Sequence, residues 1–399
     1  MQTGKARGLH GALGREGVQA LSPSTVDGNL SVVHLLSGLE IGGKERAALR
    51  LAGRGLADGG RHALWLFDTP FRSNELDFEP GDVPTRFLPR GSGLDLGFIR
   101  ALAHGVAADG VGTIHAHNDT ALCYGAFACA LLGRRRAPRL VGTFHTWPGH
   151  ATPAARLLTR WAGGRAVAVA AVSDELRHRL LTSGWLRHCR TVWNGIDLGL
   201  FRSDGTNGGW HRRLGVAPGT PLIVHVARFD PIKRHTDLIE AARLVHAAYP
   251  DAVFVLAGQG PLFAPVQDLA RDLPWVRFAA NVPDVAPLLR AASIFVLPSA
   301  HEAAPLALLE AMACGRACVC TAVGGVPAML ADYDAAGPCG LLVPPGEPPV
   351  LAAAIGRLLG DTAMREQLGT RARAAAVARF SFEREWQTYC RLYAGEPPP

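Results

Sequence analysis

The sequence alternates twice between short apolar runs and longer stretches with helical spacing. In the first half of the chain, five such runs occur at residues 31–36, 62–67, 113–117, 139–144 and 166–172. Short apolar runs of this kind are typical of strands that are buried on both faces of a parallel sheet. Their alternation with helical stretches predicts a doubly wound α/β domain.

The segment RSDGTNGGW, residues 202–210, interrupts this pattern and has the composition of a connection between domains. The alternation then restarts, with apolar runs at residues 222–227, 253–258, 276–279, 294–298, 318–321 and 341–344. We therefore predict two Rossmann-like, doubly wound α/β domains that face a central cleft. Ligands of open α/β sheets bind beyond the carboxyl ends of the strands, so both domains are expected to present loops to that cleft.

The pattern divides the chain into four predicted segments. Residues 1–29 are rich in Gly, Ser and Thr without periodicity, and are predicted to be a flexible tail. The first domain is expected at 30–201 and the second at 202–380. Residues 381–399 are predicted to form a C-terminal helix, which packs back on the first domain, and a short tail.

The composition excludes several classes of protein. With 48% hydrophobic and 19% charged residues, the chain is not mostly disordered. No apolar run approaches the ~20 residues of a membrane span, and the first residues lack the apolar stretch of a signal peptide. The eight cysteines form no CxxC pair, which favours reduced, buried thiols. These features predict a soluble, cytoplasmic protein.

The basic excess lies in the first half of the chain. Residues 1–200 hold 23 Lys and Arg against 16 Asp and Glu. Zinc spacing, helix-turn-helix cues and aromatic residues interleaved with basic ones are all missing, so no nucleic acid partner is expected. A membrane surface or an anionic acceptor fits the charge better, although an arginine-rich composition explains it equally well.

Two features are suited to binding phosphate. Gly42 and Gly43 end the loop after the first predicted strand and precede a helix, where backbone N–H groups can approach an anion. Arg228 and Lys233 follow the first strand of the second domain. Two fixed cations at a strand end can stabilise a diphosphate leaving group without a metal ion.

Two carboxylates are suited to binding hydroxyl groups. Glu302 lies in the loop after the strand at 294–298, and Glu310 lies about two turns into the next helix, which Pro305 and Gly315 bracket. Apolar neighbours surround Glu310 in the sequence, so a fully solvated position is hard to arrange. We expect one acid to contact sugar hydroxyls and the other a ribose diol.

Histidines and one acidic motif are further candidates for site residues. His145 follows the strand at 139–144 and is placed to hydrogen-bond a substrate hydroxyl, although a bystander loop histidine fits as well. The motif Asp332-Tyr333-Asp334 has the D-x-D spelling of metal-dependent transferases, but its polar surroundings predict a surface loop. His115 and His117 lie on one strand face, yet no third ligand is evident, so no metal site is expected there.

Together these motifs resemble the retaining nucleotide-sugar glycosyltransferases of family 4, the group 1 glycosyltransferases, which have the GT-B fold. The resemblance covers residues 31–393 and rests on GGKERAALRLA, TFHT, VSDEL, VWNGIDLGLF, ARFDPIKRH, LAGQGP, FVLPSAHEAAPLALLEAMACG, VGGVPAM and GLLVPPGEP. It implies an N-terminal acceptor domain and a C-terminal donor domain. It also implies a nucleotide-diphosphate sugar as donor, no cofactor and no metal.

The resemblance also assigns roles to residues. It implies that Arg228 and Lys233 bind the donor diphosphate, that Glu302 contacts the donor sugar and that Glu310 holds the ribose. His145 and the pair Gly42 and Gly43 are expected to shape the donor–acceptor site. The donor site is completed by Pro305 and Leu306.

The sequence departs from the family's pattern at four positions. Ala303 and Ala304 stand where Gly and an aromatic residue are usual. A methyl group at 303 is expected to crowd the backbone near the donor sugar, which leaves the identity of that sugar open. Arg234 replaces the common Gly after the donor lysine, and Ala328 replaces an acid. The phosphate cations and both glutamates remain, so we expect an active enzyme.

The predicted reaction is transfer of a sugar, with retained anomeric configuration, to an acceptor hydroxyl in the synthesis of a cell-surface polysaccharide or lipid-linked glycan. A small soluble acceptor stays open, as do a nucleotide-sugar epimerase of the same fold and a non-catalytic sugar-nucleotide binding or assembly protein. Arg156, Arg160 and Trp161 are predicted to contact the acceptor or an anionic membrane.

Overall fold

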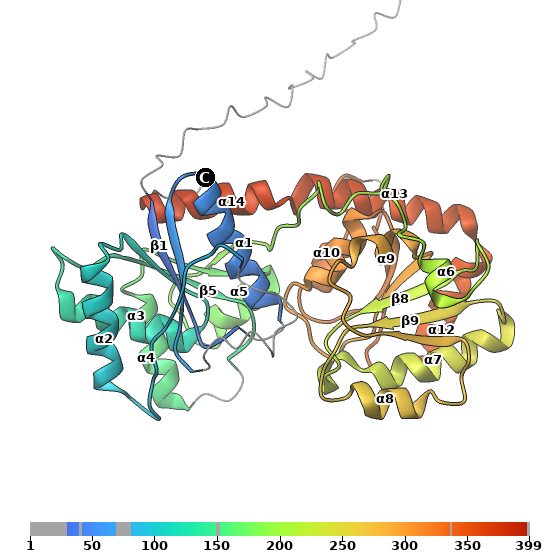
Figure 1. Cartoon of the computed structure of the whole chain (residues 1–399), viewed down its shortest axis with the longest axis horizontal. Helices are drawn as coiled ribbons and strands as arrows, with labels where there is room; N and C mark the ends of the chain where they lie inside the picture. The colour runs from blue at the N-terminus through green and yellow to red at the C-terminus, as the bar shows by residue number, and fades with distance from the viewer. Residues whose placement is uncertain (1–29, 40–41, 69–80, 149–151, 336, 397–399) are drawn as a thin grey trace, which may run out of the picture.

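The computed structural model describes residues 30–39, 42–68, 81–148, 152–335 and 337–396. The predicted tail at 1–29 lies outside the described residues. Two separate parallel sheets, each covered by helices on both faces, form two Rossmann-like α/β domains side by side (Figure 1). The predicted fold class is confirmed.

The N-terminal sheet has seven described strands in the order β3-β2-β1-β4-β5-β6-β7, all parallel. Their bounds are β1 Ser31–Leu36, β2 Arg61–Leu66, β3 Thr85–Phe87, β4 Thr113–Ala116, β5 Arg139–Phe144, β6 Ala168–Ala171 and β7 Arg190–Thr191. The helices between them are α1 Gly43–Ala57, α2 Leu96–Ala108, α3 Asp119–Leu132, α4 Pro153–Gly163 and α5 Asp174–Thr182.

The C-terminal sheet has six described strands in the order β10-β9-β8-β11-β12-β13, again parallel. Their bounds are β8 Leu222–Val226, β9 Val253–Ala257, β10 Val276–Ala279, β11 Ile294–Leu297, β12 Ala317–Thr321 and β13 Leu341–Val343. The helices are α6 Trp210–Leu214, α7 His235–Ala248, α8 Phe263–Leu269, α9 Ala286–Ala291, α10 Leu306–Ala313, α11 Val326–Leu330, α12 Pro348–Gly360 and α13 Thr362–Arg379.

Most strands lie within two residues of the predicted runs, because a strand buried on both faces has a clear apolar signature. Strand β6 begins two residues later than predicted, and Val167 before it is 52% exposed. Strands β3 and β7 were missed, since they have only three and two residues and Phe87 is their one apolar residue.

Local capping residues start several helices. Ser173 caps α5 as its side chain accepts a hydrogen bond from the Leu176 N–H, and Asp174 and Glu175 supply negative charge in the first turn. Asn118 caps α3 in the same way through the Ala121 N–H. These caps fix helices that begin at the carboxyl ends of the strands, where loops face the cleft.

The last helix, α14 Phe382–Ala394, lies on the N-terminal domain although α13 before it belongs to the C-terminal domain (Figure 1). The chain crosses between domains where Ile196 and the backbone around residue 381 exchange two hydrogen bonds, of 2.7 and 3.0 Å. Trp386, Tyr389 and Tyr393 of α14 are buried against strands of the N-terminal sheet. The C-terminal segment thereby ties the two domains together.

Glu385 of α14 makes the stability of this crossing depend on pH. Its carboxylate accepts the Gly195 N–H at 2.9 Å and lies 3.6 Å from Nη2 of Arg50. Burial nevertheless raises the pKa of Glu385 from 4.5 to about 7, against the opposing effect of Arg50. Between those two pH values the unfolded chain loses this proton and the folded chain keeps it. The residue therefore costs stability as pH rises through this window.

Between pH 5 and pH 8, we expect the free energy of unfolding of the wild type to fall by about 3 kcal/mol more than that of Glu385→Gln. The amide has no proton to lose, so the penalty disappears. Urea denaturation of both proteins at the two pH values measures the difference. Parallel pH profiles would contradict the assignment.

Candidate active site

The loops after β8 and β11 bring a lysine and a glutamate together at the carboxyl edge of the C-terminal sheet. Lys233 ends a single 3₁₀ turn, Pro231–Lys233, and its ammonium donates to Oε1 of Glu302 at 2.6 Å. The same oxygen accepts a hydrogen bond from the Ser299 hydroxyl at 2.7 Å. Glu302 is 7% exposed and Lys233 is half-buried, so the pair is held in place yet accessible from the lysine side.

The backbone of Glu302 rests on the glycine turn that follows β12. Gly324 has φ +53°, and a Cβ there would overlap the carbonyl oxygen of Glu302. A Cβ on Gly325 would likewise overlap the Ala303 carbonyl oxygen and would lie 2.8 Å from Cβ of Ser173 in the N-terminal domain. Only glycine permits this close backbone contact, so the turn fixes the position of the Glu302 loop between the two domains.

Glu310 lies in the second turn of α10 and is 5% exposed. Burial raises its pKa, and the guanidinium groups of Arg46 and Arg50 oppose that rise. Nη1 of Arg46, in the first turn of α1, lies 4.0 Å from Glu310 Oε1. An ion pair thus crosses from the N-terminal domain to the C-terminal one at this acid.

The glycine pair before α1 faces the start of α10. A Cβ on Gly43 would lie 3.8 Å from Cδ1 of Leu306, the first residue of α10 after Pro305. The backbone N–H groups at the start of α1 and the two acids therefore belong to one region between the domains. Arg228 lies two residues beyond the end of β8, at the same sheet edge, and is exposed.

His145 and Lys44 line the N-terminal side of this region. Burial lowers the pKa of His145 to about 3, and the nearby charge of Lys44 acts in the same direction. The imidazole is therefore neutral at physiological pH. Lys44 contacts Oε1 of Glu45 at 3.1 Å and donates to the Ser37 hydroxyl at 3.3 Å.

Sequence reasoning about the other histidines was wrong on one point. A third ligand does accompany His115 and His117, since His34 occupies the register position on β1 directly opposite His115 on β4. One nitrogen from each of the three rings lies within 4.8 Å of the others. The pairing of β1 with β4 is a long-range contact that a single sequence does not reveal. The motif Asp332-Tyr333-Asp334 lies in a loop where both acids are exposed.

Helix α4 carries the residues predicted to contact an acceptor or a membrane. Trp161 is half-buried and packs on Phe127, with ring centroids 4.8 Å apart, and the Arg165 guanidinium lies over the Trp161 ring. Arg156 and Arg160 lie near the carbonyls of Ser183 and Gly184. Leu157 and Leu158 are 66% and 40% exposed. In the described part of the chain, no helix has the length and hydropathy required to span a bilayer.

The departures at 303 and 304 have a packing explanation. Ala303 and Ala304 are each 7% exposed and belong to the apolar cluster of the N-terminal domain, although the chain places them in the C-terminal one. The Ala304 carbonyl accepts a hydrogen bond from Nδ2 of Asn194 at 2.9 Å. The two methyl groups thus help to hold the domains together. Arg234 adopts the left-handed conformation that glycine favours, with φ +53°.

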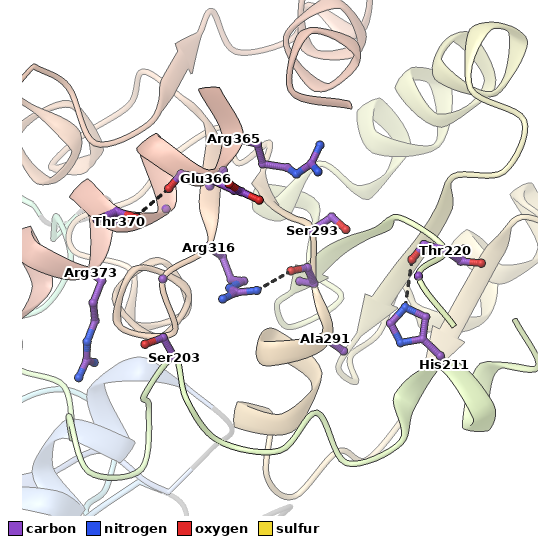
Figure 2. Close-up of a pocket in the computed structure, with 15 residues that line it drawn as sticks. Ser203, His211, Thr220, Ala291, Ser293, Arg316, Arg365, Glu366, Thr370 and Arg373 are labelled. Atoms are coloured by element: carbon purple, nitrogen blue, oxygen red, sulfur yellow. Dashed lines mark hydrogen bonds between the residues drawn. The ribbon is translucent and has the colours of Figure 1, made fainter. Parts of the chain in front are cut away.

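A hollow of about 650 Å³ lies at the opposite edge of the C-terminal sheet, before β8, β11 and β12 (Figure 2). Its central cation, Arg316, donates to the carbonyls of Ala292 and Cys314. Arg373, which also lines the hollow, donates to the carbonyls of Phe201 and Ala313. Ligands of doubly wound sheets bind at the carboxyl edge. We therefore place the candidate site at Lys233 and Glu302 rather than in this hollow.

Comparison with known proteins assigns the family. Residues 209–375 match the family model of the glycosyl transferases group 1, and residues 41–200 match that of glycosyltransferase family 4. The chain belongs to the group 1 glycosyltransferases. The two matched regions correspond to the C-terminal and N-terminal sheets of this group 1 glycosyltransferase, respectively.

Several relatives of this group 1 glycosyltransferase are known. It is 30% identical to N-acetyl-alpha-D-glucosaminyl L-malate synthase of Bacillus anthracis. The matched region covers 60% of this chain and 63% of that protein. It is 28% identical to the putative glycosyltransferase EpsF of Bacillus subtilis over 72% of this chain and 78% of that one. Anabaena Alr3699/HepE, solved with UDP and glucose, superimposes with a TM-score of 0.76 at 22% identity, over 92% of this chain and 100% of that one.

The structure brings Lys233, Glu302, Glu310 and the Gly42–Gly43 turn to one interdomain region. Sequence reasoning missed Ser299 and Lys44, whose roles depend on side chains from other loops. Lys44 directly follows the glycine pair, and Ser299 precedes Glu302 by three residues, so closeness to the recognised motifs was the available signal.

Proposed function

We propose that this protein transfers a sugar from a nucleotide-diphosphate sugar to an acceptor hydroxyl, with retained anomeric configuration and without a metal ion. The observation that carries the proposal is the contact between Lys233 and Glu302, 2.6 Å long, with Glu310 buried on the helix that follows Glu302. An ammonium group next to a carboxylate is suited to a substrate that joins a diphosphate to a polyhydroxylated sugar.

In the proposed reaction, the bond between the anomeric carbon and the diphosphate oxygen breaks as the acceptor oxygen attacks from the same face. Both electrons of the broken bond go to the diphosphate, which also takes the acceptor's proton. Lys233 and Arg228 stabilise the negative charge that develops there. Glu302 orients the donor sugar through its hydroxyls, and Glu310 accepts hydrogen bonds from the ribose. Closure of the domains excludes water that would otherwise hydrolyse the donor.

His145 acts as a neutral hydrogen-bonding group in this scheme. With a pKa near 3 it carries no ionisable proton for catalysis at neutral pH. We therefore assign it to the orientation of a donor or acceptor oxygen, and assign the proton transfer to the donor phosphate.

The proposed setting is glycan synthesis at the cell surface. The named relatives include a putative glycosyltransferase and a lipopolysaccharide core biosynthesis glycosyltransferase, LpsE of Rhizobium meliloti. Structural neighbours were solved with UDP, UDP-glucose and, for TarM, a glycosylated glycerol. Uridine-diphosphate sugars are accordingly the first donors to test.

A screen of uridine-, guanosine- and adenosine-diphosphate sugars tests the function. The expected result is a rise in melting temperature with one donor class. We also expect release of the nucleoside diphosphate that depends on an added glycan or lipid-linked acceptor. Release of nucleotide with an altered free sugar, independent of acceptor, would instead identify an epimerase. Binding of the donor without turnover on any acceptor would leave a sugar-nucleotide binding protein.

We further propose that α4 approaches an anionic membrane that holds a lipid-linked acceptor. The exposed Leu157 and Leu158 beside Arg156 support this orientation. Co-sedimentation with vesicles should increase with the fraction of anionic lipid and decrease in Leu157→Glu. Val377→Glu, at an apolar position on α13 that is 47% exposed, is the control and should sediment like the wild type. A sedimented fraction that does not depend on the anionic lipid content would contradict the proposal.

A further inference from the structure

One face of the N-terminal sheet carries a row of histidines beneath α14. His34 and His115 are register partners on β1 and β4, and His62 pairs with Val32, two residues from His34 on the same face. His117 and His145 continue the same face beyond the ends of β4 and β5. His34, His115 and His117 are 0% exposed and His62 is 3% exposed. The row leads from the amino end of β2 to the candidate active site.

Four of these rings form a continuous chain of hydrogen bonds, which we call the histidine relay (His62, His34, His117 and His145). Nδ1 of His62 lies 3.2 Å from Nε2 of His34. Nδ1 of His34 lies 3.0 Å from Nε2 of His117. Nδ1 of His117 lies 3.1 Å from Nε2 of His145. Each link joins the Nδ1 of one ring to the Nε2 of the next.

The relay couples the tautomers of its members. A neutral imidazole has one N–H donor and one bare nitrogen, so each link requires a donor on one side and an acceptor on the other. Burial lowers the pKa of all four rings, and no ring is cationic at neutral pH. The four hydrogens therefore all lie on Nδ1 or all lie on Nε2. No mixed arrangement satisfies every link.

The far end of the relay selects between these two arrangements. Nε2 of His62 is buried and has no hydrogen-bond partner among the described residues. A Cβ on Gly55 would overlap it, so the helix backbone covers this nitrogen closely. Buried N–H groups without an acceptor are rarer in proteins than unsatisfied acceptors. The bare nitrogen therefore belongs at this end, with the hydrogen of His62 on Nδ1.

We propose that the histidine relay fixes His145 as the Nδ1–H tautomer and so makes it a hydrogen-bond donor toward the cleft. With His62 donating to His34, His34 donates to His117 and His117 to Nε2 of His145. The only hydrogen of His145 is then on Nδ1. This inference rests on the proposed function in assigning His34, His62 and His117 as positioning residues for that site.

The Nδ1–H donor of His145 limits which substrate groups can bind next to it. A neutral Nδ1–H next to the Lys44 ammonium favours an oxygen that accepts hydrogen bonds, such as a phosphate oxygen or the lone pair of a sugar hydroxyl. It excludes His145 as the base that removes the acceptor's proton. The relay therefore provides a structural reason for leaving that proton to the donor phosphate.

A metal ion held by His34, His115 and His117 is the competing interpretation of the same cluster. Every ring nitrogen of these three residues already has a hydrogen-bond partner. The two nitrogens of His115 lie 2.8 Å from the Tyr393 hydroxyl and 2.8 Å from the Thr143 hydroxyl. An ion would have to break these contacts, so the observations favour the relay.

The test is a long-range ¹H–¹⁵N correlation spectrum of the full-length protein with ring-labelled histidine. His145→Ala identifies the His145 resonances by their disappearance. We expect His145 in the Nδ1–H form in the wild type. The Nε2–H form, or a stoichiometric metal in the purified protein by elemental analysis, would overturn the proposal. This readout does not depend on turnover, so it separates failure of the relay from failure of the proposed function.

Two matched substitutions test the coupling itself. His34→Phe interrupts the relay, and His115→Phe alters its fully buried register partner without touching a relay link. We expect His34→Phe to release His145 into a mixture of tautomers and to lower kcat roughly tenfold, the value of one hydrogen bond. His115→Phe should preserve the His145 tautomer. An unchanged His145 tautomer in His34→Phe would contradict the coupling, and the wild-type spectrum decides the tautomer if that variant does not fold.

Discussion

Lys233→Ala is expected to lower kcat/KM by on the order of 10²–10³, while the protein stays folded. The substitution removes the fixed cation that we place at the departing diphosphate. It also removes the ammonium donor from the buried Glu302 carboxylate, which keeps the hydrogen bond from the Ser299 hydroxyl. Because Lys233 is half-buried, we expect a stability loss of about 1–2 kcal/mol. Steady-state kinetics with the donor found by screening measures the first effect, and urea denaturation the second.

Arg243→Ala is the control for removal of a cation from the same domain. Arg243 lies on α7 and pairs with Asp272 on the surface, 2.9 Å away. The Arg243→Ala variant should retain full activity. Undiminished turnover in Lys233→Ala, or an equal loss in Arg243→Ala, would contradict the diphosphate assignment.

Gly324→Ala should abolish most of the activity by displacing Glu302 rather than by removing a functional group. The added methyl would overlap the Glu302 carbonyl oxygen, and the residue would also have to keep φ +53°. Backbone strain of this kind costs about 1–2 kcal/mol by itself, and displacement of the loop adds to it. We expect a loss in kcat of roughly 10²-fold, because a displacement near 1 Å is enough to misplace a substrate-positioning group. Kinetics and thermal unfolding measure the two effects.

Gly215→Ala separates strain from displacement. Gly215 has φ +69° and no heavy atom within 4 Å of an added Cβ, so it shares the backbone conformation of Gly324 without its contact. It should lose stability and keep its activity. Equal activities of the two variants would show that the glycine turn does not position Glu302.

The sequence was sufficient to predict the two sheets, because most of their strands are buried on both faces and appear as short apolar runs. It also located Lys233, Glu302 and Glu310, since each follows a predicted strand end or lies on the helix after one. Their closeness follows from a general rule about parallel sheets rather than from a contact visible in the chain. The short polar strands β3 and β7 lack that apolar signal and were missed.

What the sequence did not reveal depends on register and on contacts between domains. The histidine relay requires β1 to lie between β2 and β4 with His34 level with His115, which no local pattern specifies. The Ala303 methyl group was expected to crowd the backbone near the donor sugar. In the structure, Ala303 packs into the apolar cluster of the other domain, so its methyl group has a structural role. The role of Gly324 likewise depends on a loop that is distant in the chain.

The most direct measurement is a structure of the protein with a bound nucleoside diphosphate. Our account places the diphosphate within hydrogen-bonding distance of Lys233. It places the ribose at Glu310, on the side that faces Gly43. A nucleotide bound instead in the hollow around Arg316, at the opposite edge of the C-terminal sheet, would contradict it.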